Sequence, residues 1–341
     1  MTKNQIKSGG RALLSGAALA LMIGVPQIGL AEGKLSFGMV TVPPNVVHMP
    51  VIIGMELGYF KEEGLTVEML GFEGGVKSFR AVVSGDVDSA ISSGAFSLVG
   101  RANGAKTKLV LANAPKLEAT MTVQGNIKTL QDLKGKRIGI QQPGGFAFIL
   151  SMMVLREAGL TKDDVNFVSI LSEDVPPLVA GQIDTAILHV EQFKVAHSKK
   201  PDLHVLAKLW EISPKQLYTS VVVKEDMIAK RRKDVVGMTK AIIRGTRTMY
   251  SDKQKVMPIL VKHTGLDAKI LSEAYDELVA ACVWDANHGL SPERINFTAQ
   301  LMKKVGNIKG AVPSYDELVD ISIAEEALKP LGVWKGSVCP G

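Results

Sequence analysis

Cysteine is scarce in this 341-residue chain, which holds two, Cys282 and Cys339. Its six histidines are scattered, and neither a C-x-x-C nor an H-E-x-x-H pattern occurs. The sequence therefore predicts no metal site, no cofactor and no catalytic cysteine. In an oxidising compartment the two cysteines could form one disulfide that holds down the C-terminal tail. Two independent thiols are the alternative, and the sequence alone leaves both open.

Other motifs are missing as well, and each absence removes a class of function. There is no nucleophile elbow of the form G-x-S-x-G and no P-loop. The net charge of +6 comes without a basic stripe interleaved with aromatic residues, so no nucleic acid partner is expected. We interpret the basic cluster at residues 230–233 as a solvated helix face. The sequence predicts no catalytic residues.

Residues 1–31 have the pattern of a signal peptide. A basic start with Lys3, Lys7 and Arg11 precedes the uncharged run ALLSGAALALMIGV at residues 12–25, and small residues lead up to Ala31. A membrane anchor is the alternative, but small and polar residues interrupt the run too often for a spanning helix. The sequence thus predicts cleavage near Ala31 and a soluble, exported protein in the periplasm. At 310 residues, 341 minus 31, the mature chain is long enough for two cored domains.

One short stretch of the chain occurs twice. SGDVDSAIS at residues 84–92 returns as AGQIDTAIL at residues 180–188, so that Gly85 matches Gly181 and Asp88 matches Asp184. The surroundings repeat too: strand, helix, strand, helix and strand patterns follow one another before and within each copy. Each copy therefore predicts an α/β lobe with a mainly parallel central sheet. We expect both aspartates to fix local turns through nearby backbone N–H groups rather than to contact a ligand.

The rest of the chain has a different pattern. Residues 226–306 are predicted to be helical, with breaks near Ser251, Gly265 and Leu290, and a last helix is expected at about 315–331. These helices are expected to pack against the first lobe. Strand candidates near 120–123 and 217–223 would carry the chain between lobes in two crossovers, with a cleft between the lobes. The predicted lobe 1 comprises residues 32–120 and 219–341, and lobe 2 comprises residues 121–218.

Ligands of open α/β sheets bind beyond the carboxyl ends of the strands, where helix N-termini present free N–H groups. Five predicted strand–helix junctions qualify, at residues 41–49, 71–75, 92–96, 141–148 and 189–193. Paired N–H groups there suit a carboxylate, sulfonate or phosphate. No arginine lies in the five loops, which disfavours a highly charged anion held by side-chain ion pairs.

Side chains in these loops limit the ligand loosely. Four aromatic rings could stack on a flat ligand or belong to the core: Phe72, Phe96, Phe146 and Phe148. His48 and His189 could donate to an anion or be structural. Glu73 and Glu191 would suit an amino group if they face the cleft.

The chain resembles the bacterial solute-binding proteins of nitrate/sulfonate/taurine-type and thiamine-precursor-type ABC importers. The resemblance covers nearly the whole mature chain, and between residues 34 and 193 it rests on ELGYFKEEGLTVEML, VVSGDVDSAISSG, LQDLKGKRIGI, REAGLTKDDV and VAGQIDTAIL in the family's order. It implies an α/β fold, the type II periplasmic binding protein, with two lobes joined by a two-crossover hinge. It also implies delivery of a small-molecule ligand to a membrane permease driven by a cytoplasmic ATPase. We expect a monomer.

The resemblance and the loops together assign the ligand-binding residues. They are Pro43, Asn45, His48, Phe72, Ser92, Ser93, Gly94, Gly144, Gly145, Phe146, Glu191 and Gln192. The chain departs from many sulfonate-type members in two places. The loop at residues 142–146 lacks Ser and Thr, and Glu191-Gln192 stands where many members have an acidic residue followed by proline. Both departures count against a sulfonate or nitrate and leave room for an aromatic or heterocyclic ligand. The predicted solute is a sulfonate, a carboxylate or an aromatic or heterocyclic compound.

Two other functions use similar lobes. The eukaryotic thiamine-pyrimidine synthases resemble this family but carry a cysteine-rich motif with an iron-binding histidine, and nothing comparable occurs here. A ligand sensor that docks on a membrane receptor would use the same cleft. The export signal and the missing catalytic motifs favour a binding protein that captures a small organic solute for import.

Overall fold

The computed structural model describes residues 33–170, 175–336 and 339. The predicted signal peptide and its cleavage point at Ala31 lie outside these residues. Within the described ranges, none of the helices combines the length and the apolar character needed to cross a bilayer.

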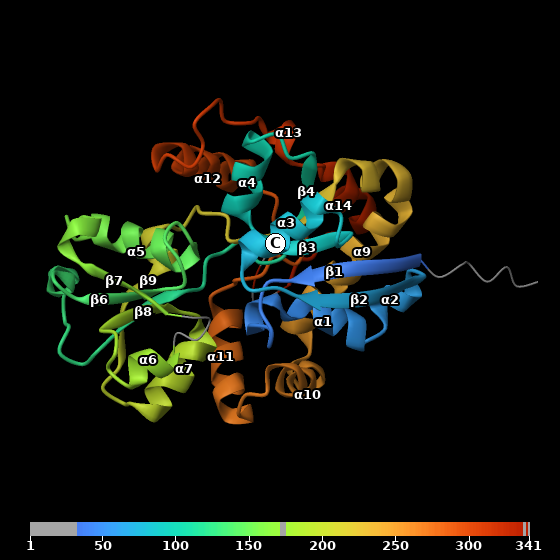
Figure 1. Ribbon diagram of the computed structural model, residues 1–341. Helices are drawn as coiled ribbons and strands as arrows, with labels where there is room; N and C mark the ends of the chain where they lie inside the picture. The colour runs from blue at the N-terminus through green and yellow to red at the C-terminus, as the bar shows by residue number, and fades with distance from the viewer. Residues whose placement is uncertain (1–32, 171–174, 337–338, 340–341) are drawn as a thin grey trace, which may run out of the picture. The chain divides into compact units, whose positions relative to one another are not determined.

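The first of two sheets has the strand order β2-β1-β3-β10-β4. Its strands are β1 (Gly33–Met39), β2 (Leu65–Gly71), β3 (Ser89–Ser93), β4 (Thr107–Leu111) and β10 (Thr219–Lys224). β1 pairs in parallel with β2 and β3, whereas β10 runs antiparallel to β3 and β4. We call this sheet and the helices on it the first lobe (Figure 1).

The second sheet repeats the plan with the order β7-β6-β8-β5-β9. Its strands are β5 (Thr120–Val123), β6 (Arg137–Ile140), β7 (Asn166–Ser169), β8 (Thr185–Leu188) and β9 (His204–Lys208). Here β5 is the antiparallel strand, between β8 and β9. In each sheet the antiparallel strand is the one that the chain forms on arriving from the other sheet. We call this sheet and its helices the second lobe.

Two chain segments connect the sheets and run beside each other. Residues 112–119 lead from β4 to β5, and residues 213–218 lead back to β10. The N–H of Tyr218 donates to the carbonyl of Pro115 at 3.0 Å, and that of Thr219 donates to Ala114 at 3.1 Å. The two predicted crossovers are therefore present and bonded to each other.

Helices follow most strands, as the hydrophobic pattern predicts. In the first lobe they are η1 (Val46–His48), α1 (Met49–Glu56), α2 (Tyr59–Glu62), α3 (Gly75–Ser84) and α4 (Gly94–Ala102). In the second lobe they are η2 (Leu130–Leu133), α5 (Phe146–Glu157), η3 (Lys162–Asp164), α6 (Val175–Val179), α7 (Val190–Lys199) and α8 (Leu209–Ile212). The apolar run at residues 46–60 forms the contiguous η1 and α1 and then α2. Gly58, with a φ of 78°, separates α1 from α2.

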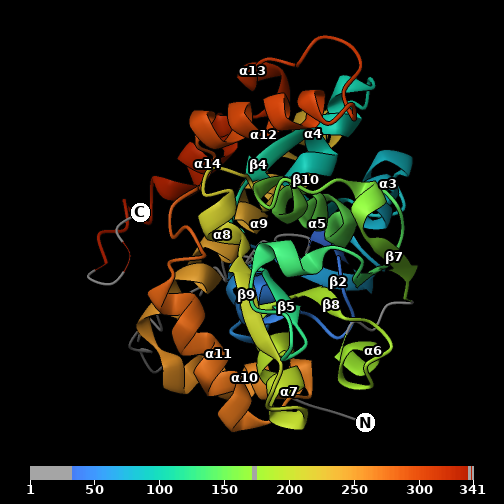
Figure 2. The ribbon, with the colours of Figure 1, turned by 90° about the vertical axis from the view of Figure 1, so that its left-hand side faces the viewer.

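The C-terminal helices are α9 (Glu225–Ser251), α10 (Lys253–Thr264), α11 (Ala268–Ala280), α12 (Pro292–Lys304), α13 (Tyr315–Leu318) and α14 (Ile321–Leu328). α9 packs on α1 and α14 on β4, and α12 lies against α4, so most of this region covers the first lobe as expected. α11 differs, because it contacts α7 of the second lobe (Figures 1 and 2). The predicted last helix is split at Val319, which bridges to Leu109 on β4.

The repeated aspartates have a structural role, as predicted. Their main partners lie on neighbouring strands and not in their own turns. Asp88 accepts from the N–H and the hydroxyl of Ser36 on the neighbouring strand β1, at 2.9 and 3.1 Å. Asp184 accepts from the N–H of Arg137 on β6 at 2.8 Å and forms an ion pair with its guanidinium. Each aspartate thus holds a parallel strand, β1 or β6, beside the strand that the repeated stretch forms, β3 or β8.

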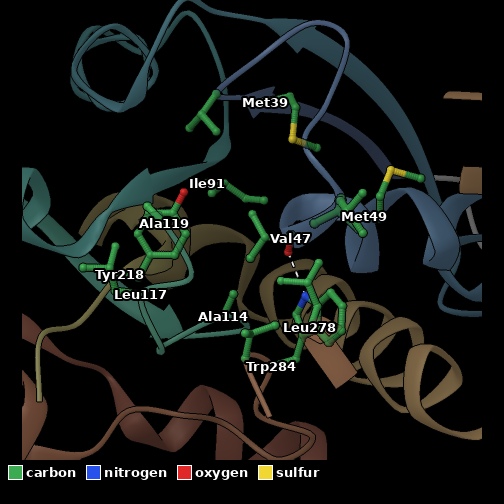
Figure 3. Packing of buried hydrophobic residues seen from close by; sticks show 14 of the residues in the cluster. Met39, Val47, Met49, Ile91, Ala114, Leu117, Ala119, Tyr218, Leu278 and Trp284 are labelled. Atoms are coloured by element: carbon green, nitrogen blue, oxygen red, sulfur yellow. Dashed lines mark hydrogen bonds between the residues drawn. The ribbon is translucent and has the colours of Figure 1, made fainter. Parts of the chain in front are cut away.

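The main hydrophobic cluster runs through the crossovers. Ala114, Leu117 and Ala119 of the first crossover are buried beside Val47, Met49 and Trp284 (Figure 3). The indole Nε1 of Trp284 donates to the carbonyl of Val47 at 2.8 Å. Cys282, next to this cluster, forms a disulfide with Cys339, which ties the tail to the end of α11.

Candidate functional site

A cavity of about 90 Å³ lies where both lobes and the crossovers meet. Residues after β1, β3, β6 and β8 reach it, which are the strand ends that the fold predicts for a ligand site. Its lining is Val40, Thr41, Asn45, His48, Gly74, Gly75, Ser93, Phe96, Phe146, His189, Tyr218 and Thr219.

Four aromatic rings from four different elements form one side of the cavity. Phe146, the first residue of α5, stacks on Tyr218 of the second crossover with 5.4 Å between ring centroids. It also stacks on His189, just before α7, at 6.2 Å and an interplanar angle of 11°. His48 of η1 lies 6.3 Å from Tyr218 and 6.5 Å from His189. These separations are typical of interacting rings, so the group can also receive a flat ligand.

His48 is a buried base without a partner. Its ring is 2% exposed, and neither ring nitrogen has a hydrogen-bond partner among the described residues. Burial, followed by the charge of His189, lowers the pKa of His48 from 6.5 to about 3. The imidazole is therefore neutral at physiological pH and can offer one donor and one acceptor nitrogen. Buried polar atoms without partners are costly, which makes them candidates for ligand contact.

Glu118, in the first crossover, supports the cavity from behind. Its side chain is 1% exposed, and its Oε1 contacts Nδ1 of His189. Its Oε2 accepts from the N–H of Val190 at 3.2 Å, at the N-terminus of α7. A carboxylate at a helix N-terminus is favoured by the free N–H groups there. Glu118 thus orients a cavity residue from the hinge.

Glu191 connects the lobes directly. It lies on α7 and is 2% exposed, and its Oε1 accepts from Nδ2 of Asn45 at 3.0 Å and from the N–H of Val46 at 3.2 Å. Its Oε2 is buried without a hydrogen-bond partner among the described residues. Burial, followed by the negative charge of Glu118, raises the pKa of Glu191.

The carboxyl groups of Glu118 and Glu191 act on the cavity. Burial raises the pKa of Tyr218, which lines the cavity, and the charges of Glu118 and Glu191 raise it further. Among the described residues, no lysine or arginine lines the cavity. The site can therefore stabilise a neutral or positively charged donor group better than an anion.

The structure brings several of the predicted site residues together. Asn45, His48, Ser93 and Phe146 line the cavity. Four others are hydrogen-bonded to a lining residue or precede one in sequence, namely Ser92, Gly94, Gly145 and Glu191. The hydroxyl of Ser92 donates to the carbonyl of Gly75 at 3.3 Å, and the N–H of Gly94 donates to Tyr218 at 2.8 Å. A side chain at position 94 would meet Leu217 at 2.5 Å, so a glycine is needed there for close packing.

The remaining four predicted residues also lie outside the cavity lining. Pro43 is exposed and borders a separate hollow beside Val42 and Ile52. Phe72 packs over Gly38 in a core cluster. Gly144 is exposed with a φ of 74°, a turn conformation that favours glycine. The side chain of Gln192 accepts from the N–H of His189 at 2.9 Å and so caps the N-terminus of α7.

Sequence reasoning missed Glu118 and Tyr218. Both lie in the crossovers, outside the strand–helix junctions at which the sequence predicts ligand contacts. A polar residue inside a predicted crossover is the signal that would have found them, because both crossovers pass under the cleft of such a fold. His189 and Phe96 were recognised as loop residues and prove to line the cavity.

A family model described as NMT1/THI5 like matches residues 45–256. A Bacillus subtilis protein that is named as a binding protein, YtlA, is 22% identical over 290 residues, 83% of this chain and 86% of that protein. A Haemophilus influenzae protein named for thiamine biosynthesis is 27% identical over 179 residues, 52% of this chain and 56% of the other. A yeast 4-amino-5-hydroxymethyl-2-methylpyrimidine phosphate synthase, THI13, is 25% identical over 162 residues, 46% of each chain. The chain thus spans about half the length of the latter two relatives.

Solved structures share the fold over most of the chain. The alkanesulfonate-binding protein SsuA of Xanthomonas axonopodis superposes with a TM-score of 0.68 at 17% identity, covering 85% of this chain and 99% of that one. The periplasmic nitrate-binding protein NrtA of Synechocystis gives a TM-score of 0.72 at 10% identity, covering 90% and 91%. The fold is that of periplasmic binding proteins, as the resemblance implies.

Proposed function

The chain belongs to the NMT1/THI5-like family, and from this premise we propose that it is an exported solute-binding protein. It captures a small organic solute between its lobes in the periplasm and delivers it, as a monomer, to the permease of an ABC importer. The proposed lobes are residues 32–120 with 219–341, and residues 121–218. The names of SsuA, NrtA and YtlA, all binding proteins, support this reading.

One observation carries the proposal: groups from both lobes and from the second crossover converge on one cavity. Asn45 and His48 come from the first lobe, Phe146 from the second and Tyr218 from a crossover. A ligand that contacts all of them favours the closed arrangement by the free energy of those contacts. The permease would then recognise the closed lobes.

We further propose an amino-bearing aromatic or heterocyclic ligand. The aromatic rings suit a flat molecule, and the buried Glu118 and Glu191 favour a hydrogen-bond donor or a positive charge. A sulfonate, nitrate or carboxylate would meet the negative field without a cationic side chain. The relative named for thiamine biosynthesis supports a pyrimidine within this class.

The second candidate is an enzyme like the yeast synthase THI13, whose name denotes a pyrimidine-forming activity. The chain lacks the cysteine-rich motif of such synthases, and its two cysteines are joined to each other. We therefore favour binding without turnover. A sensor that presents the same closed lobes to a membrane receptor remains the alternative use of the site.

A thermal-shift screen on residues 32–341 tests the proposal. Aminopyrimidines, thiamine, alkanesulfonates, nitrate and aromatic carboxylates are added to protein that has been unfolded and refolded to remove carried-over ligand. A compound at about 100 times its Kd stabilises the folded state by about 2.7 kcal/mol. We expect a higher melting temperature with the amino-bearing rings and no change in the compound afterwards.

The matched control is Tyr218→Ala, which removes one cavity ring and should abolish most of the shift. A shift with sulfonates or nitrate alone would contradict the proposed ligand class. Conversion of the compound would contradict a binding protein, and a shift that survives Tyr218→Ala unchanged would contradict the site.

A further inference from the structure

The contact between Asn45 and Glu191 joins the two lobes through protein atoms alone. Asn45 lies in the first lobe between β1 and η1, whereas Glu191 belongs to α7 of the second. Asn45 is 8% exposed, and the bond from its Nδ2 to Oε1 of Glu191 measures 3.0 Å. The N–H of Val46 adds a second bond to the same oxygen. Hydrogen bonds to a buried carboxylate are stronger than those between neutral groups.

Thr41 determines which end of the Asn45 amide faces Glu191. Its hydroxyl donates to Oδ1 of Asn45 at 2.9 Å and accepts from the N–H of Asn45 at 3.3 Å. With Oδ1 occupied, the amide presents its donor end, Nδ2, across the cleft. The three side chains therefore form one directed chain of hydrogen bonds from Thr41 through Asn45 to Glu191.

The groups around Glu191 explain why it needs such a partner. Glu118 adds a like charge to the same region, whereas His189 contributes a favourable one. Tyr218 faces both carboxyl groups from the second crossover. A buried carboxylate in this setting is costly unless donors satisfy it. Asn45 and Val46 satisfy Oε1, and Oε2 remains buried and without a partner among the described residues.

We propose that Asn45 is a positioning residue that latches Glu191 across the cleft and keeps Oε2 of Glu191 for the donor group of a ligand. We call the Thr41–Asn45–Glu191 chain the interlobe latch. Because it consists of protein atoms only, it holds the lobes together before any ligand arrives. The part that concerns Oε2 rests on the proposed function, but the latch itself does not.

The size of the cavity agrees with a latch. Its volume is about 90 Å³, whereas an engineered cavity of about 150 Å³ is known to take up benzene. A ring-sized ligand therefore enters when the lobes separate, and the latch is the contact that opposes this separation. Ligand entry is then coupled to breaking the bond between Asn45 and Glu191.

The distance between the lobes, measured by pulsed EPR without any ligand, tests the latch. Spin labels are placed at Arg80→Cys on α3 and Glu157→Cys on α5, both exposed and in different lobes, with the native disulfide kept oxidised. We expect one short distance in the otherwise unchanged protein. Asn45→Ala and Thr41→Val should each raise the ratio of open to closed molecules about tenfold, equivalent to about 1.4 kcal/mol.

Two further variants separate the latch from general damage. Thr41→Ser keeps the hydroxyl and should keep the short distance. Asn103→Ala removes an exposed amide that bonds within its own helix end, to the carbonyl of Val99, and should have no effect. Unchanged distances in both Asn45→Ala and Thr41→Val, with melting curves that show folded protein, would overturn the latch. If one variant fails to fold, the other still decides.

The result is independent of the ligand screen. If the latch variants open but no compound raises the melting temperature, the proposed function fails and the latch stands. If a ligand is found and the distances do not respond to Asn45→Ala, the latch fails and the proposed function stands.

Discussion

His48 and Glu191 carry the chemistry of the site at the scale of single residues. Burial lowers the pKa of the His48 imidazole and raises the pKa of the Glu191 carboxyl group. Both shifts favour the uncharged form of the group. The ring nitrogens of His48 and Oε2 of Glu191, which have no partner among the described residues, can form hydrogen bonds with a ligand. The same burial also makes the stability of the protein depend on pH.

His48 should weaken the fold as the pH falls. Its pKa is about 3 in the folded state and 6.5 when unfolded, so between these values the unfolded chain binds the extra proton. The contribution of His48 to stability is fully present above pH 6.5 and is lost at about 1.4 kcal/mol per pH unit below it. Both proteins are compared at pH 6.5 and pH 5. We expect the free energy of unfolding to fall by about 2 kcal/mol more in the wild type than in His48→Asn.

Urea unfolding of both proteins at pH 6.5 and pH 5 gives this difference directly. The window avoids the more acidic range in which Asp132, Asp164 and Asp184, whose pKa values are lowered, take up protons. Equal losses in the two proteins would assign the pH dependence to another group.

At the scale of elements, the crossovers are more than connections. Glu118 in the first crossover bonds the N-terminus of α7 and the ring of His189, and Tyr218 in the second contributes a cavity wall. A change in the angle between the lobes must therefore act on residues that touch the ligand site.

Removing the Glu118 carboxyl group should destabilise the protein strongly. Glu118→Ala leaves the N–H of Val190 and Nδ1 of His189 without this partner in a buried place. We expect a loss of about 3 kcal/mol in the free energy of unfolding, measured by urea titration. Glu118→Gln keeps the shape and one acceptor, so its loss should be smaller.

The control for this series is Glu293→Ala. Glu293 pairs with Lys215 on the surface, where both side chains are more than half exposed. Its removal should leave the stability nearly unchanged, because solvent screens an exposed ion pair. A Glu118→Ala loss of the same small size would mean that the crossover does not support α7.

At the scale of the whole molecule, the disulfide joins distant parts of the chain. Cys282 and Cys339 are separated by 57 positions, and the closed loop includes α12, α13 and α14. Arg247 of α9 holds the same tail, since its guanidinium donates to the carbonyls of Leu331 and Gly332. The C-terminal region is thereby anchored to the helix that packs on the first lobe.

The double variant Cys282→Ser/Cys339→Ser should be less stable by about 4 kcal/mol. The loop entropy that the disulfide removes from the unfolded chain accounts for this figure. Differential scanning calorimetry of oxidised wild type and double variant measures it, and reduced wild type should resemble the variant. A difference under about 1 kcal/mol would show that tail contacts such as those of Arg247 suffice.

The sequence by itself determined the plan of this protein. The repeated Gly-x-x-Asp stretches, their periodic neighbours and the helix stop signals predicted two α/β lobes and the breaks after α9 and α10. These features are local, because turn glycines and hydrophobic periods act over a few residues. The loops after β1 and β3, and the Phe146 loop, could be placed at the site for the same reason.

Only the tertiary structure decided how side chains are used. Phe72 and Gln192 follow strands as Phe146 and Asn45 do, but Phe72 packs on Gly38 and Gln192 caps a helix. Glu118 reaches α7 from a crossover 72 positions away in sequence. Likewise, the choice between a disulfide and two thiols depended on the distance between Cys282 and Cys339 in space. Such pairings result from the packing of distant segments, and no local pattern encodes them.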